Sequence, residues 1–174
     1  MEIKITEFVE SAKDAEGIVV IIDVFRAFST AYFLFANGAK AIIPVSDKSE
    51  AFKLKEENPD YILMGEEMGT MVKGFDYGNS PSEIKSVDFT GKTVVIRSTS
   101  GTQGLVNVDK NKAKEVIAGS FMGVKAIVDY IKTKNPEQVT LVSLDNVGQG
   151  RAVEDYVCAE CIRDLLEGKD IDYN

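Results

Sequence analysis

Six short, continuous apolar runs recur along the chain, and segments with helical periodicity separate most of them. Short runs rich in Val and Ile are typical of strands that are buried on both faces of a sheet. The runs are "IVVII" at 18–22, "AIIPV" at 41–45, "YILM" at 61–64, "TVVI" at 93–96, "EVIA" at 115–118 and "VTLVSL" at 139–144. Strands that alternate with helices predict an α/β protein with a mixed, largely parallel sheet covered on both faces.

Four segments carry helical signals. The segment at 28–36 is apolar nearly all round and stops before Asn37-Gly38, a common helix end. Asp47 and Glu50 have the spacing of a capping box. Apolar residues at helical spacing form two further stripes, which are Phe121, Val124, Ile127, Val128 and Ile131, and then Val153, Val157, Cys161 and Leu165. The one long stretch without periodicity runs from about Gly65 to Thr90, and such stretches in compact domains are usually functional or disordered.

Charge and composition argue against several functional classes. The formal net charge of −8 disfavours nucleic-acid binding, which needs a basic surface, but it leaves room for a small phosphorylated substrate. No apolar stretch approaches the length of a membrane span, which is roughly 18 to 20 residues. Met1 is followed by no secretory signal, and there are only two cysteines, so we expect a cytoplasmic location.

The chain contains no histidine. This excludes Ser-His-Asp triads, Cys-His dyads and the usual zinc sites. Acid–base or metal chemistry then falls on carboxylates, Lys, Tyr or Cys, and the abundant carboxylates favour a hard cation such as Mg²⁺.

Polar residues follow five of the apolar runs, at the points where the strands are predicted to end. Ligands of open α/β sheets bind beyond the carboxyl ends of the strands. The residues found there are Asp23 and Arg26, Glu66 and Glu67, Arg97 to Thr102, Ser120, and Asp145. They are suited to binding a metal ion and an oxyanion. "RSTSGT" at 97–102 is the most anion-like segment, because small hydroxyl residues leading into a helix present backbone N–H groups.

Each of these features also has a purely structural interpretation. "RSTSGT" can be an ordinary Ser/Thr cap, and Asp23 with Arg26 can be a local ion pair at a helix start. Glu66 and Glu67 can belong to a solvated loop. Cys158 and Cys161 form C-x-x-C inside a predicted helix rather than at its start, which favours core-facing thiols over a redox pair.

Several stretches together resemble the 2-phosphosulfolactate phosphatase family of the coenzyme M pathway. They are "IIDVFRAFST", "ANGAK", "MGEEMG", "GFDYGNSPSEI", "STSGT", "AGSF" and "GRAVEDYVCAECI", in the family's order and from about residue 18 to 163. "GFDYGNSP" is the most specific of them. The resemblance implies a three-layer α/β/α fold and Mg²⁺-dependent hydrolysis of a phosphate monoester on a sulfonated three-carbon acid.

The resemblance also implies site residues. Those matching the family's motifs are Asp23, Arg26, Glu66, Asp76, Gly78, Asn79, Ser80, Thr99, Gly101, Thr102, Glu154 and Asp155. The chain departs from the family at Glu67, where members have Arg, at Phe28, where they have Thr, and at Ser100, where they have Asn. Family members continue beyond the position of Asn174, which leaves room for a missing C-terminal segment in a single domain spanning residues 1–174.

The resulting hypothesis is a phosphatase acting on 2-phosphosulfolactate or a closely similar small phosphorylated acid. The catalytic candidates are Asp23, Arg26, Glu66 and Asp76, and the expected Mg²⁺ ligands are Asp23, Glu66 and Asp145. The substrate-binding candidates are Asn79, Ser80, Arg97, Ser98, Thr99, Ser100, Gly101, Thr102 and Ser120. The alternative is a catalytically impaired homologue that binds small anions. The oligomeric state is left open, and a homodimer interface could cover an edge strand.

Overall fold

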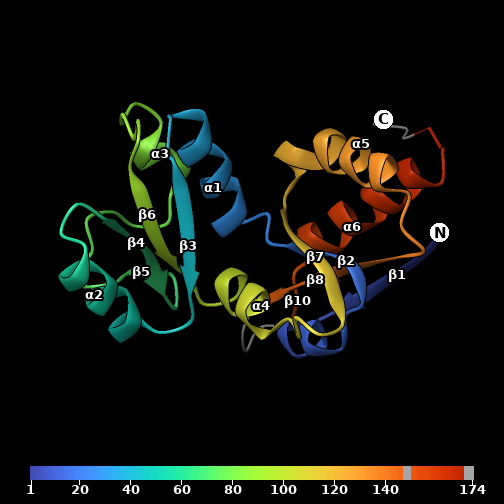
Figure 1. Cartoon of the computed structure of the whole chain (residues 1–174), viewed down its shortest axis with the longest axis horizontal. Coiled ribbons are helices and arrows are strands. Elements are labelled where there is room, and N and C mark those ends of the chain that lie inside the picture. Colours follow the sequence, from blue (N-terminus) through green and yellow to red (C-terminus); the bar gives the residue numbers. More distant parts are fainter. Residues whose placement is uncertain (147–149, 171–174) are drawn as a thin grey trace.

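The computed structural model describes residues 1–146 and 150–170, in two lobes that lie side by side (Figure 1). The first lobe contains a four-stranded parallel sheet in the order β1-β8-β2-β7. Its strands are β1 (Glu2–Glu7), β8 (Gln138–Ser143), β2 (Gly17–Ile22) and β7 (Ala113–Gly119). A short antiparallel pair, β9 (Asp145–Asn146) with β10 (Gly150–Arg151), follows β8.

The second lobe contains a four-stranded mixed sheet in the order β3-β6-β4-β5. Its strands are β3 (Ala41–Val45), β6 (Thr93–Arg97), β4 (Ile62–Glu67) and β5 (Thr70–Met71). The first three are parallel, and β5 pairs with β4 in the opposite direction. The predicted α/β fold with mixed, largely parallel strands is therefore confirmed, and the strands are divided between two sheets.

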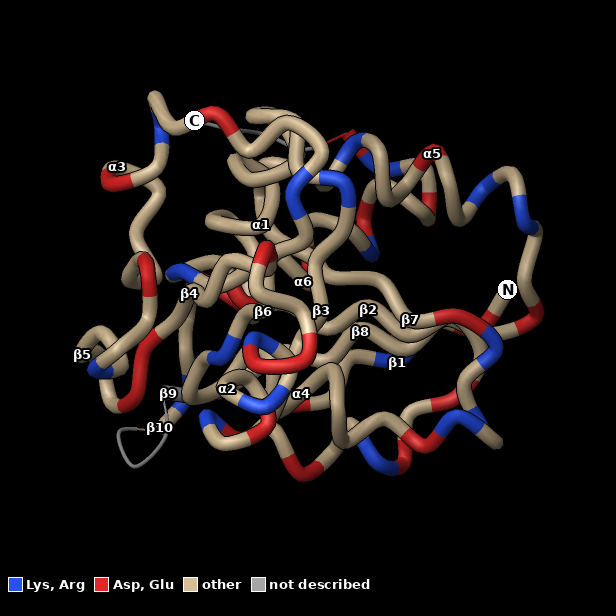
Figure 2. The backbone as a smooth tube through the Cα atoms, turned by 60° about the vertical axis from the view of Figure 1, so that its left-hand side comes forward, with Lys and Arg blue, Asp and Glu red and all other residues tan. Residues whose placement is uncertain are grey.

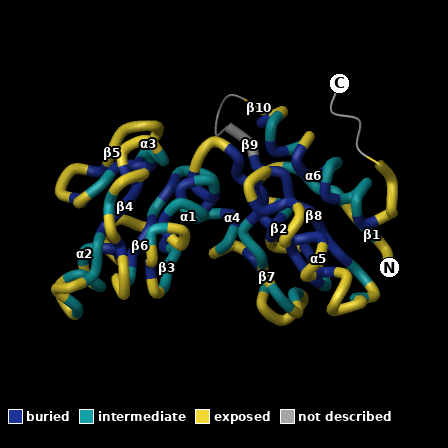
Figure 3. Tube along the Cα trace, turned by 90° about the horizontal axis from the view of Figure 1, so that it is seen from above, coloured by how far each residue is buried: buried dark blue, intermediate teal, exposed yellow. Residues whose placement is uncertain are grey.

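Helices cover both faces of each sheet. On the first sheet, α5 (Val124–Lys134) and α6 (Val153–Leu166) cover one face, and the 3-10 helix η1 (Val9–Asp14) with α4 (Gly101–Asn107) covers the other. On the second sheet, α2 (Lys48–Glu57) packs on one face, and α1 (Ala27–Ala36) with α3 (Pro81–Ile84) packs on the other. A short 3-10 helix, η2 (Phe121–Gly123), precedes α5. The buried positions accordingly run along β2 and β8 in one lobe and along β4 and β6 in the other (Figure 3).

All six apolar runs of the sequence are strands in the structure. β1 was not among them, because "EIKITE" alternates between exposed and half-buried positions and lies at the edge of its sheet beside β8. The 65–90 stretch is more regular than expected. It contains the β4–β5 hairpin and α3, and Tyr77 forms a parallel bridge to Met64 of β4.

Charged residues of both signs are interspersed over the described chain (Figure 2). Within residues 1–146 and 150–170, no helix combines the length and the hydropathy that a membrane span requires.

Candidate functional site

The carboxyl ends of the two sheets approach each other where α1 and α4 lie between the lobes (Figures 1 and 3). Asp23 follows β2 of the first sheet, and Gly101 begins α4 just after β6 of the second. A Cβ atom on Gly101 would lie 2.5 Å from Asp23 Oδ2 and 2.8 Å from the Ala27 Cβ. Only a glycine lets this turn come so close to the carboxylate. The packing therefore joins the strand ends of both sheets around Asp23.

Asp23 is a buried carboxylic acid with only 6% of its surface exposed. Its Oδ1 accepts a hydrogen bond from the Ala27 backbone N–H at 3.0 Å, at the start of α1. The pKa of Asp23 is raised to about 6, mainly by burial and also by the negative charges of Glu66 and Glu154, while the N–H groups of Ala27 and Gly101 oppose the shift. An acid with such a pKa changes charge near neutral pH, which is common at catalytic sites.

The raised pKa of Asp23 predicts a pH-dependent stability difference between the wild type and Asp23→Asn. Between the ordinary pKa near 3.8 and the folded-state pKa of about 6, the folded protein holds a proton that the unfolded chain has lost. Wild-type stability therefore falls as pH rises through this window. The variant should be more stable well above pH 6 by about 3 kcal/mol, and nearly equally stable below pH 4. Urea unfolding in EDTA at several pH values measures this, and a difference that stays constant from pH 4 to 7 would contradict it.

Glu66 ties the end of β4 to the loop that follows β6. It is 8% exposed, and its carboxylate accepts hydrogen bonds from the Thr99 N–H at 2.5 Å and the Thr99 hydroxyl at 2.9 Å. The Gly69 N–H, in the β4–β5 turn, donates to the same carboxylate at 2.6 Å. Glu66 is thus held on three donors and lies close enough to Asp23 to affect its pKa.

The 98–102 loop is closed by hydrogen bonds of its own. The Ser98 N–H donates to Thr102 Oγ1 at 2.8 Å, the Thr102 N–H donates to Ser98 Oγ at 3.0 Å, and the Thr102 hydroxyl donates to the Ser98 carbonyl at 2.9 Å. Thr99 N–H is taken by Glu66 and Gly101 N–H by Asp23. Two carboxylates therefore occupy N–H groups that the sequence suggested for an anion. Ser98 Oγ accepts from the Thr102 N–H in the first turn of α4, although Ser98 is not the N-cap residue of that helix.

Thr102→Val is expected to destabilise the fold by about 1 to 3 kcal/mol, because it leaves the buried Ser98 N–H and carbonyl without their partner. Thr133→Val is the matched control, since the Thr133 hydroxyl donates to the Tyr130 carbonyl at an exposed position. Its effect should stay within about 0.5 kcal/mol. Thermal or urea unfolding measures both. Equal effects would show that the Ser98–Thr102 bonds contribute nothing specific.

The comparison with known proteins identifies the family. The family model described as 2-phosphosulpholactate phosphatase matches residues 3–174. The chain belongs to this family. A relative from Thermotoga petrophila is 37% identical over 152 residues, and one from Bacillus subtilis is 33% identical over 156 residues. These alignments cover 87% and 88% of this chain but 63% and 66% of the relatives. Both relatives are named probable 2-phosphosulfolactate phosphatase.

A further relative, from Carboxydothermus hydrogenoformans, is 38% identical over 167 residues and carries the same name. The alignment covers 95% of this chain and 68% of that protein. The chain thus spans about two thirds of the length of the curated relatives that it matches. The family resemblance seen in the sequence motifs is confirmed.

The "GFDYGNSP" motif, at residues 74–81, runs beside β4 towards the site. Asp76 accepts a hydrogen bond from the Leu63 N–H at 2.8 Å and lies 3.6 Å from Lys55 Nζ, near the start of β4. Its carboxylate therefore holds the loop on the strand, whereas Glu66 lies at the strand's other end. Because Tyr77 pairs with Met64 in parallel, Asn79 and Ser80 continue in the direction of the Glu66 end.

Four buried polar side chains have oxygen atoms without a hydrogen-bond partner in the described part of the chain. They are Asn79 Oδ1, Ser120 Oγ, Thr30 Oγ1 and Ser143 Oγ, on side chains that are 6%, 0%, 0% and 0% exposed. An unpaired buried oxygen costs about 1 to 3 kcal/mol. Asn79 and Ser120 were predicted from the sequence. Thr30 and Ser143 were missed, although the place of Thr30 in "FRAFST", one helical turn beyond Ala27, and that of Ser143 at the end of β8 were usable signals.

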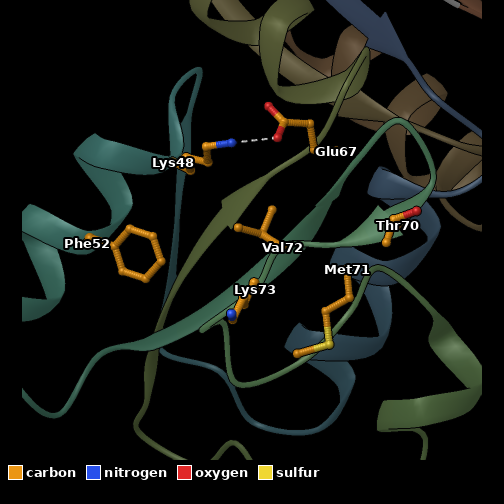
Figure 4. A pocket seen from close by; sticks show the side chains of 7 residues that line it. All are labelled: Lys48, Phe52, Glu67, Thr70, Met71, Val72 and Lys73. Atoms are coloured by element: carbon orange, nitrogen blue, oxygen red, sulfur yellow. Dashed lines mark hydrogen bonds and ion pairs between the residues drawn. The ribbon is translucent and has the colours of Figure 1, made fainter.

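Arg97 lies on the opposite face of the second sheet from Glu66 and Ser98. Its NH1 donates to the Glu66 carbonyl at 2.6 Å, and its NH2 lies 3.3 Å from Glu67 Oε1. Glu67 also pairs with Lys48 of α2 at 2.7 Å. Glu67, at the position where the sequence resemblance implies Arg, therefore pairs with two cations, of which Figure 4 shows Lys48. Arg26, three residues after Asp23 in the sequence, is exposed and forms no ion pair with any residue that the structure describes.

Glu154 and Asp155, at the start of α6, complete the surroundings of Asp23. Asp155 is 4% exposed and accepts a hydrogen bond from the Val24 N–H at 2.7 Å, which fixes the turn after β2. Asp145 belongs to β9, and its side chain lies outside the described part of the structure. In the described ranges no three acids or thiols are grouped as metal ligands.

Proposed function

We propose that this chain carries the catalytic site of a phosphoric monoester hydrolase. The proposed substrate is 2-phosphosulfolactate or a closely similar small phosphorylated acid. Family membership and the names of the relatives support the reaction class. The observation that carries the proposal is Asp23, a buried acid with a pKa of about 6 at the meeting point of both sheets. Two free cysteines, Cys158 and Cys161, support a cytoplasmic location.

The local charge supports a role for Mg²⁺. The negative charges of Glu66 and Glu154 act on Asp23 and raise its pKa. Because these carboxylates would also repel a dianionic phosphate, a cation is needed to bring the phosphate close to them. Mg²⁺ needs only one or two carboxylates, because it keeps several water molecules and binds substrate phosphate. Asp23 and Glu66 fit this requirement. When bound, the ion would neutralise charge on the phosphoryl oxygens.

The chain's own residues would bind and orient the substrate. Arg26 is an exposed residue at the start of α1, three positions after Asp23, and its guanidinium can form a bidentate contact with a phosphate or sulfonate. The oxygens of Asn79, Ser120 and Thr30 are buried without a partner among the described residues, and we assign them to the ligand. Glu66 holds Thr99 and thereby positions the 98–102 loop. Asp23, ionised above pH 6, acts as the base for an attacking water or as the nucleophile itself.

A small-anion-binding protein without catalysis is the second candidate, because Glu67 neutralises Arg97 and Lys48. An assay of phosphate release from 2-phosphosulfolactate and phospholactate, with Mg²⁺ or with EDTA, separates the candidates. We expect release with Mg²⁺ and a loss of at least about a hundredfold with EDTA, restored by added Mg²⁺. No turnover on either ester, alongside measurable binding of the esters, would reject the hydrolase. Equal rates of phosphate release with Mg²⁺ and with EDTA would reject the proposed Mg²⁺ dependence.

A further inference from the structure

Helix α1 carries the chain from the first lobe to the second and packs on both (Figure 1). Phe28 is buried in an apolar cluster of the first sheet, whereas Leu34 is buried in a cluster of the second sheet. Residues four apart lie on one face of a helix, so Tyr32 shares the face of Phe28. Thr30, whose buried oxygen has no partner among the described residues, shares that of Leu34. Tyr32 is therefore directed towards the first lobe.

Tyr32 meets the first lobe at Gly123, where η2 ends and α5 begins. A Cβ atom on Gly123 would lie 1.6 Å from the Tyr32 hydroxyl oxygen and 2.2 Å from its Cζ. Gly123 has φ −104° and ψ −2°, a right-handed helical conformation that suits other residues as well, so glycine is needed here only because the ring comes so close.

The Tyr32 side chain makes this contact as a neutral ring. Burial raises the pKa of Tyr32, and the nearby Cys158 of α6 raises it as well. The described residues offer the Tyr32 hydroxyl no hydrogen bond. The shape of the ring, rather than its hydroxyl, is therefore what joins α1 to η2.

The contact between Tyr32 and Gly123 closes a ring of elements beside the candidate site. On one side of the ring, β2 and β7 pair in parallel up to their ends, where the Asp23 N–H donates to the Gly119 carbonyl at 3.1 Å. From there the chain continues in two directions, because Asp23 leads into α1 and Ser120 leads into η2. Tyr32 joins these two segments again.

Each of the joined segments holds a candidate site residue. The Ala27 N–H at the start of α1 donates to the Asp23 carboxylate at 3.0 Å. The Gly123 N–H donates to the Ser120 carbonyl at 3.0 Å and closes the η2 turn. The pairing of β2 with β7 fixes the two backbones, but the Asp23 carboxylate follows Ala27, and so its position depends on α1.

We propose that Tyr32 is a positioning residue. Its ring, seated on Gly123, holds α1 against η2 and thereby keeps the Asp23 carboxylate and the Ser120 turn at a fixed separation. The effect of Tyr32 on turnover rests on the proposed phosphatase function, whereas the contact itself can be measured without turnover.

Amide hydrogen exchange, followed by NMR, tests the contact without any substrate. Val20 and Val95 are fully buried in the central strands β2 and β6, and their amides report global unfolding. In Tyr32→Ala, the amides of Ala27 and Gly123 should exchange at least about tenfold faster relative to these two. Unchanged exchange at Ala27 and Gly123, or equal acceleration at all four amides, would overturn the proposal.

Gly123→Ala disturbs the same contact from the other side. In the wild-type background the new methyl group displaces the Tyr32 ring, so the Ala27 amide should again exchange at least about tenfold faster. In the Tyr32→Ala background the methyl group meets no ring and should change this exchange by less than about twofold. Equal increments in both backgrounds would overturn the proposal. Tyr130→Ala, which removes a 41% exposed tyrosine from α5, is the matched control and should leave Ala27 exchange as in the wild type.

Phosphate release from 2-phosphosulfolactate with Mg²⁺ measures the effect on turnover. Tyr32→Ala should lower kcat about tenfold to a hundredfold, because a displacement of about 1 Å in a catalytic group can cost about a hundredfold. Tyr32→Phe keeps the ring and should stay within about twofold of the wild type. Wild-type kcat in a folded Tyr32→Ala would overturn the positioning role. A wild type that releases no phosphate would instead reject the proposed function, and the exchange measurements would then decide on the contact alone.

Discussion

Replacing Asp23 with asparagine is expected to lower kcat for phosphate release by about a hundredfold to ten-thousandfold. Asparagine has almost the same size, and its Oδ1 can still accept the hydrogen bond from the Ala27 N–H. The substitution removes the negative charge, and with it the base or nucleophile and one proposed Mg²⁺ ligand. Initial rates of phosphate release at saturating 2-phosphosulfolactate and Mg²⁺ measure the effect.

The control for this experiment is Asp129→Asn, which removes an exposed acid paired with Lys125 at 2.6 Å. It should leave kcat within about twofold of the wild type. Circular dichroism and unfolding curves test whether Asp23→Asn is folded. Because the variant is expected to be more stable than the wild type above pH 6, a loss of activity there would not be explained by unfolding. Wild-type turnover in a folded Asp23→Asn would remove Asp23 from the mechanism.

Most strands were predictable because each carries a short, continuous apolar run, which in the central strands reflects burial on both faces. The division into two sheets was not, because "IVVII" and "TVVI" look alike whether they share a sheet or not. In the structure α1 and α4 lie between the lobes (Figure 1), and the pattern of a single segment does not encode which strands become neighbours. β1 was missed because charged and polar residues alternate with the apolar ones in "EIKITE", whereas the edge strands β3 and β7 each keep a short apolar run.

The meeting of Asp23, Glu66 and the 98–102 loop follows from the rule that ligands gather at the carboxyl ends of strands. The face on which each side chain lies does not follow so directly. Alternation along β6 puts Arg97 opposite Ser98, but only the structure tells which face carries α1 and which carries α2. Nor could the sequence predict that Glu66 and Asp23 accept hydrogen bonds from the N–H groups of the 98–102 loop. Such contacts depend on the approach of two sheets.

Gly101→Ala is the second substitution with a large expected effect. The added Cβ would lie 2.5 Å from Asp23 Oδ2 and 2.8 Å from the Ala27 Cβ, in a site where neither group can yield easily. Asp23 is held by the Ala27 N–H, and Ala27 is buried at the start of α1. We expect a destabilisation of about 1 to 3 kcal/mol and a displacement of the carboxylate. A shift of about 1 Å in a catalytic group can cost about a hundredfold in kcat.

Gly104→Ala separates crowding from the displacement of Asp23, because Gly104 lies in the same helix. Its Cβ would lie 2.8 Å from Ile21 Cγ2 and 3.0 Å from Leu144 Cδ2, so it crowds apolar side chains only. Both variants should lose similar stability in urea unfolding. Only Gly101→Ala should lose kcat, while Gly104→Ala should stay within about threefold of the wild type when both are measured well below their melting temperatures. Equal losses of kcat would mean that α4 as a whole supports the site, and that the close approach of Gly101 to Asp23 has no special role in turnover.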